Sequence, residues 1–260
     1  MPADLEQLRA NAEAKLEKIL AKLDERHKAE LRKAIAEYGW NVPDEVWQGI
    51  QSDMENEELA AAIVLLMASA DEWTTDAIKD QGVLAKGYSR REFAEYHFTA
   101  QRRVQELAAQ TAETLRKQIT RKVRDSQLNG PGDVGKITDD GIDATIDDVL
   151  DDSRRKTIAT DQTTGGFSLG QRKAAERADG AKTSGGGDGA ATEAGQSVTI
   201  EMVWNTERDN LVCKWCRPLD GEPESVWGLV FPDGPGPDTH KNCRCYLTPR
   251  IVVESSTSES

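Results

Sequence analysis

The sequence predicts a mainly α-helical protein, in which long N-terminal helices precede a smaller α+β C-terminal domain with a zinc-knuckle-like Cys/His module. Three observations support this fold class. Apolar residues recur every three or four positions over most of residues 3–127, which is the period of an amphipathic helix. Residues 198–204 alternate and are β-branched, as strands are, and residues 246–253 also predict a strand. All four cysteines of the chain lie between these two strands.

Four helices are expected in the N-terminal half, at residues 3–38, 44–52, 55–80 and 89–127. Gly39 and Pro43 end the first of them, because glycine and proline disfavour a continuing helix. Ser89 and Glu92 form a capping box at the start of the fourth, in which each side chain satisfies a backbone donor of the other residue.

Asn129-Gly130-Pro131-Gly132 is the clearest break in the first two-thirds of the chain. It divides a helical region, residues 1–130, from a C-terminal domain, residues 131–254. The segments that follow are an acidic helix, a glycine-weakened helix, a flexible glycine-rich loop, the Cys/His module and a disordered polar tail, expected at 138–152, 157–182, 183–195, 204–250 and 255–260.

Composition narrows the function classes. The formal net charge of −13 argues against a general nucleic-acid coat, since phosphate binding depends on Lys and Arg. No apolar run approaches the roughly 20 residues of a membrane-spanning helix, and the N-terminus lacks the pattern of a signal peptide. The cysteines are therefore expected in a reducing cytoplasm, where metal binding is favoured over disulfides. Two disulfides remain the alternative for an exported chain.

The cysteines and one histidine form two short clusters. Cys213 and Cys216 are separated by two residues, a spacing that lets one turn present both sulfur atoms to an ion. His240 and Cys243 have the same spacing, and Cys245 follows. If residues 243–249 are extended, Cys243 and Cys245 point to opposite faces and only one of them binds. We expect a structural Zn²⁺ site made by Cys213, Cys216, His240 and Cys243, with Cys245 buried or substituting.

No catalytic residues are predicted, because four protein ligands leave no open position on the metal. The alternative is that the thiols stay reduced without an ion. A zinc-containing nuclease hairpin is disfavoured, since a strand and not a helix follows Cys245. The segment 197–260 is also acidic, with six basic against ten acidic side chains. Residues 102–124 carry seven basic and two acidic side chains, which indicates either a solvated helix face or a surface for DNA or an acidic partner.

Several of these stretches together resemble the Mu F-like head morphogenesis family of tailed bacteriophages. In that family a Trp-x-Thr strand precedes Cys-x-x-Cys, a Leu-Asp-Gly turn and a closing His-Pro-Asn-Cys-Arg-Cys. The matching parts of this chain are Trp204-Asn205-Thr206, Cys213-Lys214-Trp215-Cys216, Leu219-Asp220-Gly221, Phe231-Pro232-Asp233-Gly234 and His240-Lys241-Asn242-Cys243-Arg244-Cys245. The similarity covers about residues 153–253, with 183–195 as an insertion.

The chain departs from the family pattern at two places. Lys241 stands where the family has proline, and Thr160-Asp161-Gln162 stands where it has Arg-Thr-Glu. The resemblance implies a minor head protein that associates with the portal and possibly other head proteins, in head morphogenesis and in DNA packaging or delivery. It also implies a virion location, in the head interior or at the portal vertex, after assembly in the host cytoplasm. We expect no membrane and no small-molecule substrate.

Two other functions belong to different classes. A nucleic-acid-binding protein would use the basic face at 102–124 together with the zinc module. A phage-encoded effector enzyme is the third hypothesis, because domains of this family also occur fused to toxins. It is the least favoured, since little chain follows the Cys/His module.

Overall fold

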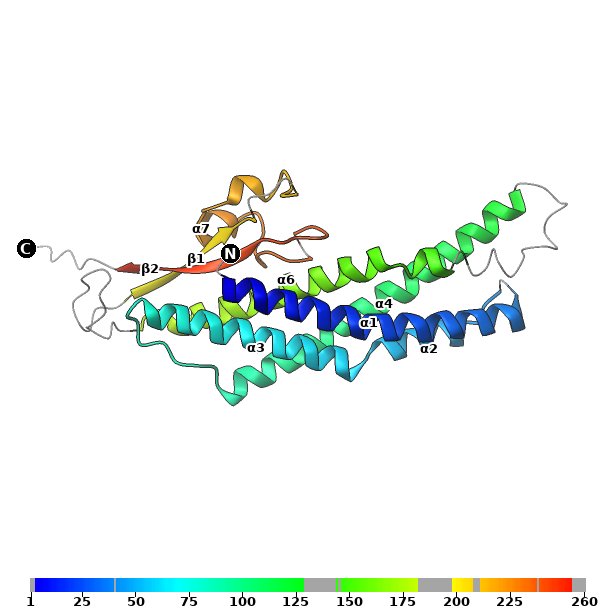
Figure 1. Ribbon diagram of the computed structural model, residues 1–260, viewed down its shortest axis with the longest axis horizontal. Coiled ribbons are helices and arrows are strands. Elements are labelled where there is room, and N and C mark those ends of the chain that lie inside the picture. Colours follow the sequence, from blue (N-terminus) through cyan, green and yellow to red (C-terminus); the bar gives the residue numbers. More distant parts are fainter. Residues whose placement is uncertain are drawn as a thin grey trace, which may run out of the picture. The chain divides into compact units, whose positions relative to one another are not determined.

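The computed structural model describes residues 3–39, 41–128, 144, 146–181, 198–207, 211–237 and 239–253. It confirms the mainly helical fold with long N-terminal helices and a small sheet near the C-terminus (Figure 1). The long helices are α1 (Ala3–Tyr38), α2 (Asp44–Met54), α3 (Glu57–Asp80), α4 (Arg90–Leu128) and α6 (Asp152–Ala178). The C-terminal elements are β1 (Val198–Asn205), the 3₁₀ turn η1 (Arg217–Leu219), α7 (Glu224–Trp227) and β2 (Tyr246–Val253).

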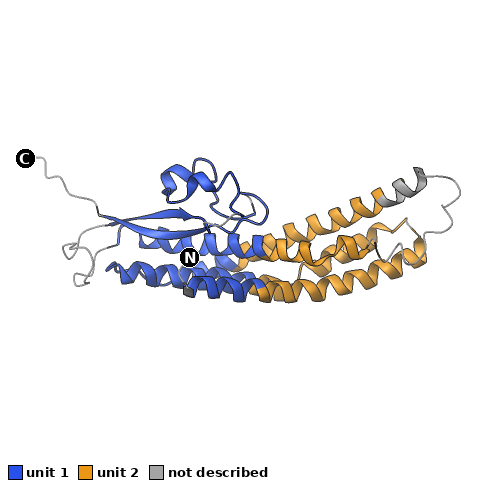
Figure 2. Ribbon diagram, turned by 45° about the horizontal axis from the view of Figure 1, so that its top comes forward, with its two compact units in different colours: residues 1–13, 63–96, 160–260 blue, residues 14–62, 97–159 orange. Residues whose placement is uncertain are grey.

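The chain divides into two compact units, each assembled from several segments (Figure 2). Unit 1 comprises residues 1–13, 63–96 and 160–260, and unit 2 comprises 14–62 and 97–159. Four of the long helices, α1, α3, α4 and α6, contribute residues to both units. The units are thus discontinuous in sequence, unlike the single boundary expected at residue 130.

Capping side chains fix the starts of two helices. The Ser89 amide donates to the Glu92 carboxylate at 2.6 Å, and the Glu92 amide donates to the Ser89 hydroxyl at 3.3 Å. The predicted capping box at the start of α4 is therefore confirmed. Asn56 caps α3 in a similar way, since its side-chain oxygen accepts from the amides of Glu58 and Leu59 at 2.8 and 3.2 Å.

Unit 2 has an apolar core drawn from several of its helices. Its buried residues are Leu31, Ile35, Trp47, Ile50, Leu115, Ile119, Ile146, Val149 and Leu150. Of the acidic helix predicted at 138–152, residues 144 and 146–149 are helical, whereas 138–143 and 145 lie outside the described residues. Asp147 from this segment forms an ion pair with Lys28 at 2.9 Å.

Unit 1 builds its main core on the sheet. Strand β1 alternates strictly, with Val198, Ile200, Met202 and Trp204 buried. It pairs antiparallel with β2 in a register that sets Val198 opposite Val253 and Trp204 opposite Leu247. Trp227 is fully buried against Trp204, with 5.7 Å between the ring centroids. The same core includes Cys216, Cys243 and Cys245.

Helix α6 is continuous although Gly165, Gly166 and Gly170 interrupt its apolar pattern. It begins at Asp152 and ends at Ala178, earlier at both ends than the predicted 157–182. A methyl group on Gly170 would lie 2.2 Å from the carbonyl oxygen of Met67, and one on Gly166 would lie 2.5 Å from a methyl of Leu66. These glycines therefore let α3 and α6 approach closely within unit 1.

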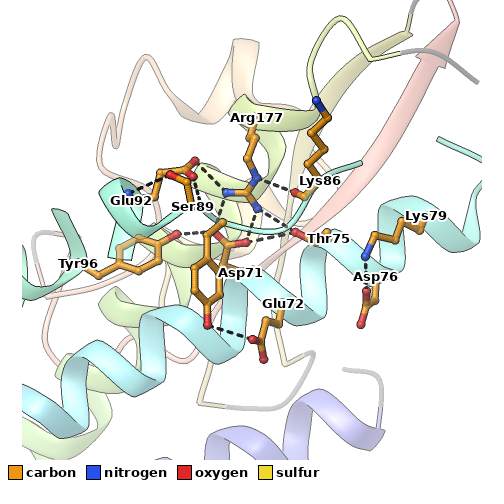
Figure 3. A network of polar contacts seen from close by, with 11 residues as sticks. Asp71, Glu72, Thr75, Asp76, Lys79, Lys86, Ser89, Glu92, Tyr96 and Arg177 are labelled. Carbon is orange, nitrogen blue, oxygen red and sulfur yellow. Dashed lines mark hydrogen bonds and ion pairs between the residues drawn. The ribbon is translucent and has the colours of Figure 1, made fainter. Parts of the chain in front are cut away.

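A buried charge network joins α3, α4 and α6 within unit 1 (Figure 3). The Arg177 guanidinium donates to both carboxylate oxygens of Asp71 and to Glu92, the last at 3.1 Å. The Tyr96 hydroxyl donates to Asp71 as well. Burial, together with the hydrogen bond to Asp71, raises the pKa of Tyr96 well above its ordinary value.

None of the described helices is long and apolar enough to cross a membrane. The glycine-rich loop predicted at 183–195 and the tail predicted at 255–260 lie outside the described residues.

Candidate metal centre

Two of the predicted ligands lie on the turn that precedes η1. The Cys216 amide donates to the Cys213 sulfur at 3.3 Å, and the Arg217 amide donates to the Cys213 carbonyl at 3.1 Å. These bonds close the turn over a two-residue gap and place both sulfur atoms on one side of it. All four cysteines of the chain are free thiols.

The structure brings His240 onto this turn from 24 residues further along the chain. Its Nε2 lies 3.1 Å from the sulfur of Cys213 and 2.9 Å from that of Cys216. Its Nδ1 lies 2.9 Å from the Lys241 carbonyl oxygen, a contact that requires a proton on Nδ1. The lone pair of Nε2 therefore faces the two sulfur atoms, as it does when histidine binds a metal.

A second group of three sulfur atoms adjoins the first. The ligand atoms of Cys216, Cys243 and Cys245 all lie within 4.8 Å of one another, and so do those of Cys213, Cys216 and His240. The opposite orientation expected for Cys243 and Cys245 does not occur. Strand β2 begins only at Tyr246, and Asn242 before the pair has a φ of 58°, so Cys243 and Cys245 follow a turn and lie outside the regular strand.

The three neighbouring thiols share their protons unequally. Hydrogen bonds from the thiols of Cys216 and Cys245 lower the pKa of Cys243 to about 3. The contact with Cys243 raises the pKa of Cys216 above its ordinary value. A cation bound among these buried sulfur atoms would stabilise their thiolate form.

A small cavity of about 10 Å³ adjoins these groups. Among the residues that line it are Cys213, Cys216, His240 and Cys245, whereas Cys243 is not one of them. Cys245 therefore borders the same cavity as Cys213, Cys216 and His240, and this sets it apart from Cys243.

The donor set and its spacing suit zinc. Tetrahedral zinc with Zn–S of about 2.3 Å and Zn–N of about 2.0–2.1 Å separates a sulfur from a nitrogen ligand by about 3.6 Å. The observed separations of 3.1 and 2.9 Å would have to widen by about half an ångström or slightly more. A side-chain adjustment of that size lies within reach of a turn and a loop, so the residues fit the ion.

The loop between the two clusters contributes side chains to the main core of unit 1, which corrects an expectation drawn from its composition. Its glycines and prolines suggest few side chains to pack. In the structure Leu219 and Trp227 are buried and Phe231 packs against the same core. The Trp227 indole also donates to the Met202 carbonyl at 3.0 Å, so packing and hydrogen bonding tie this loop to the sheet.

Three residues outside the Cys/His clusters hold the second cluster in place. Asp161 and Thr164 on α6 and Arg9 on α1 contact the backbone of residues 242–244. Burial raises the pKa of Asp161 to about 6, despite the hydrogen bond from the Asn242 amide. Sequence patterns do not identify these residues as part of the site. The available signal is the row of polar residues at Asp161, Thr164, Ser168 and Gln171, which shares one helix face.

The exposed rim of the site carries an aromatic residue and a cation. Trp215 is 61% exposed, and the Lys214 amine lies 4.9 Å from the centroid of its ring.

Comparisons with known proteins give this chain no relative: no protein-family model, no curated protein and no solved structure matches it.

Proposed function

We propose that this chain is a non-enzymatic minor head protein of a tailed bacteriophage, and that a structural zinc ion fastens its C-terminal module. The convergence of Cys213, Cys216 and His240 on the small cavity supports the zinc site best. A fourth protein ligand completes the tetrahedron and leaves no position for a reacting water. When bound, the ion acts as a cross-link between the two clusters.

The fourth ligand in this proposal is Cys245 instead of Cys243. Cys245 lines the cavity that the other three ligands share, and Cys243 does not. Cys243 then remains as a buried neighbouring thiol, in contact with Cys216 and Cys245. Because Cys216 and Cys245 bind the ion as thiolates, Cys243 can donate its thiol proton to their sulfur atoms as an outer partner that does not bond to the ion.

Metal content of single-cysteine variants tests this assignment. We expect one zinc per chain in the purified protein, and a tetrahedral thiolate spectrum after replacement by cobalt(II). Cys245→Ser should weaken zinc binding by more than the roughly 10–100-fold that loss of an outer partner costs. Cys243→Ser should weaken it by no more than that. A reversed order would make Cys243 the ligand, and a wild-type protein without metal would remove the zinc site.

The head-protein proposal rests on the order of motifs from Trp204 to Cys245, which resembles the Mu F-like family. Its proposed partners are the portal protein and possibly other head proteins, with packaged DNA as a further contact. The proposed location is the head interior or the portal vertex, reached from the host cytoplasm.

Co-purification with a portal protein, and mass spectrometry of assembled particles, test the head-protein proposal. We expect a few copies of the chain in heads or procapsids. Absence from both, together with no portal binding, would contradict it.

Nucleic-acid binding is the second candidate, and a specific surface on α4 favours it. Arg116, Lys117, Arg121 and Arg124, with Glu113 and Thr120, line an open depression of about 550 Å³. Part of this positive charge is neutralised, since Arg116 pairs with Asp44 at 2.9 Å and Lys117 with Glu113 at 3.0 Å. A duplex shift that weakens steeply with salt, and is lost in Arg121→Ala with Arg124→Ala, would support it. A shift that is absent at low salt would exclude it.

A further inference from the structure

We propose that Arg9, Asp161 and Thr164 are positioning residues that set the geometry of the second ligand cluster. We call these three side chains the backbone clamp. The inference rests on the proposed metal site and adds to it the helices that determine how tightly the site binds. All three residues belong to unit 1, as does the whole Cys/His module.

The clamp holds three successive residues of the ligand-bearing segment. The Asn242 amide donates to the Asp161 carboxylate at 2.7 Å. The Thr164 hydroxyl donates to the Cys243 carbonyl at 2.5 Å, and the Arg9 guanidinium donates to the Arg244 carbonyl at 2.6 Å. The polar groups of this backbone are thus bound to side chains of α1 and α6, not to a neighbouring strand.

The clamp residues also depend on one another. Arg9 donates a second hydrogen bond to the Thr164 hydroxyl at 3.0 Å, which leaves the hydroxyl proton for the Cys243 carbonyl. The exposed fractions of Arg9, Asp161 and Thr164 are 8%, 8% and 3%. Water therefore cannot easily replace these bonds, and the chain of donors holds one arrangement.

The turn that the clamp holds has an uncommon backbone conformation. Asn242 is the one described residue other than glycine with a positive φ, at 58°. This turn lies between His240 and Cys243, so it sets the angle between the imidazole and the sulfur atoms that follow. Asparagine tolerates this region better than most residues but does not require it. The Asp161 carboxylate, which accepts from the same residue's amide, selects the conformation.

The polar face of α6 continues this arrangement beyond the clamp. Gln171 bonds to both backbone groups of Leu247, and Arg172 donates to the Pro232 carbonyl at 2.9 Å. The missing side chain of Gly236 lets its backbone approach Gly165, since a methyl on Gly236 would lie 3.0 Å from the Gly165 Cα. One helix face thus binds the module's backbone at several points. These bonds hold the ligand loop in one shape, so the free energy of ion binding is reduced little by the cost of ordering the loop.

The zinc affinities of variants at Asp161 and Thr164, compared with that of a control variant at Asp179, test the clamp. Asp161→Ala leaves the Asn242 amide without its hydrogen-bond acceptor. We expect zinc to bind roughly 10–100-fold more weakly and to be released faster. Asp161→Asn keeps an oxygen acceptor and should restore most of the affinity. Thr164→Val is similar in size and should weaken binding comparably. The control is Asp179→Ala, because Asp179 also accepts a backbone amide, that of Ile200 at 3.1 Å, in the same unit.

Two readouts separate a positioning role from general stability. If the clamp positions the ligands, Asp161→Ala lowers zinc affinity, whereas Asp179→Ala lowers only the stability of the fold. Equal zinc affinity in wild type, Asp161→Ala and Thr164→Val would overturn the proposal.

Hydrogen exchange of the Asn242 amide in the metal-free protein is the second readout, and it does not depend on zinc. We expect protection in wild type and in Asp179→Ala, and rapid exchange in Asp161→Ala. A wild type that binds no zinc would refute the metal site alone, while rapid exchange in metal-free wild type would refute the clamp.

Discussion

His27 is fully buried in unit 2, and neither of its ring nitrogens has a hydrogen-bond partner among the described residues. Burial lowers its pKa from 6.5 to about 4, while nearby Asp53 acts in the opposite direction. The folded state thus keeps the imidazole neutral at a pH at which the unfolded chain binds a proton. Stability contributed by the neutral ring is complete above pH 6.5 and is lost as the pH falls toward 4.

His27→Leu tests this effect, because leucine fills a similar volume without a titrating group. The wild type should lose at most about 3 kcal/mol between pH 7 and pH 4 from this residue, since each pKa unit corresponds to ~1.4 kcal/mol. The difference in unfolding free energy between wild type and variant, measured in urea at both pH values, isolates the contribution. A difference independent of pH would mean that His27 does not titrate as inferred.

Residue identity explains why sequence patterns located the Cys/His cluster but not the side chains that hold its backbone. Cysteine and histidine at short spacings are distinctive, so Cys213, Cys216 and His240 were predictable as a set. Asp161 and Thr164 look like ordinary polar residues of a helix. Their partners are backbone groups some 80 residues away, which no local pattern can indicate.

At the scale of helices, the Asp71 network is a buried ionic junction between α3, α4 and α6 (Figure 3). The Asp71 side chain is fully buried, and that of Arg177 is 14% exposed. Removing one partner of such a pair leaves the other charge buried without compensation. Asp71→Ala should therefore lower the free energy of unfolding by about 3–5 kcal/mol.

Asp76→Ala is the matched control for the junction. Asp76 lies on the same helix and forms an exposed ion pair with Lys79 at 3.0 Å. Exposed pairs contribute little, so this change should alter stability by no more than about 0.5 kcal/mol. Equal losses of unfolding free energy in the two variants, measured in urea, would show that the buried junction stabilises the fold no more than an exposed ion pair does.

Replacing two helical glycines by alanine should change the stability of the fold in opposite directions. Gly170→Ala would place a methyl against the Met67 carbonyl of α3, and we expect a loss of about 1–3 kcal/mol. Gly49 lies in α2 with nothing within 4 Å of an added methyl, so Gly49→Ala should gain about 0.5–1 kcal/mol. Thermal unfolding of both variants checks the prediction, and a gain at Gly170 would contradict the close packing of α3 and α6.

For the whole molecule, the period of apolar residues was enough to predict α1, α2, α3 and α4, and alternation with β-branching was enough to predict β1. It did not predict the two units, because the segments of each unit are far apart in sequence and no periodicity reports which helices pack together. Helix α6 has a weak apolar pattern for a physical reason. It buries polar side chains against backbone and glycines against α3, so its burial does not appear as an apolar stripe.

Removing zinc should loosen the module without melting the helices. Cys216, Cys243 and Cys245 belong to the same core as Trp204 and Trp227, whereas the long helices also pack in cores to which no cysteine contributes. A chelator should therefore change the near-UV signal of the tryptophans and leave the far-UV helix signal nearly unchanged. Cys213→Ser and Cys216→Ser should reproduce this result. Loss of the helical signal on chelation would contradict the division into a metal-fastened module and independent helices.

Among the described residues the sheet consists of two strands, so each strand has an outer edge that another chain could pair with. At Trp204 and Leu247, which face each other in the register, the backbone groups point away from the partner strand. The Trp204 groups bond to Gly221 and Glu222, and those of Leu247 bond to the Gln171 amide. Pro249 offers no donor at all. The bonded groups of Trp204 and Leu247 and the missing donor of Pro249 oppose strand pairing between copies along these edges.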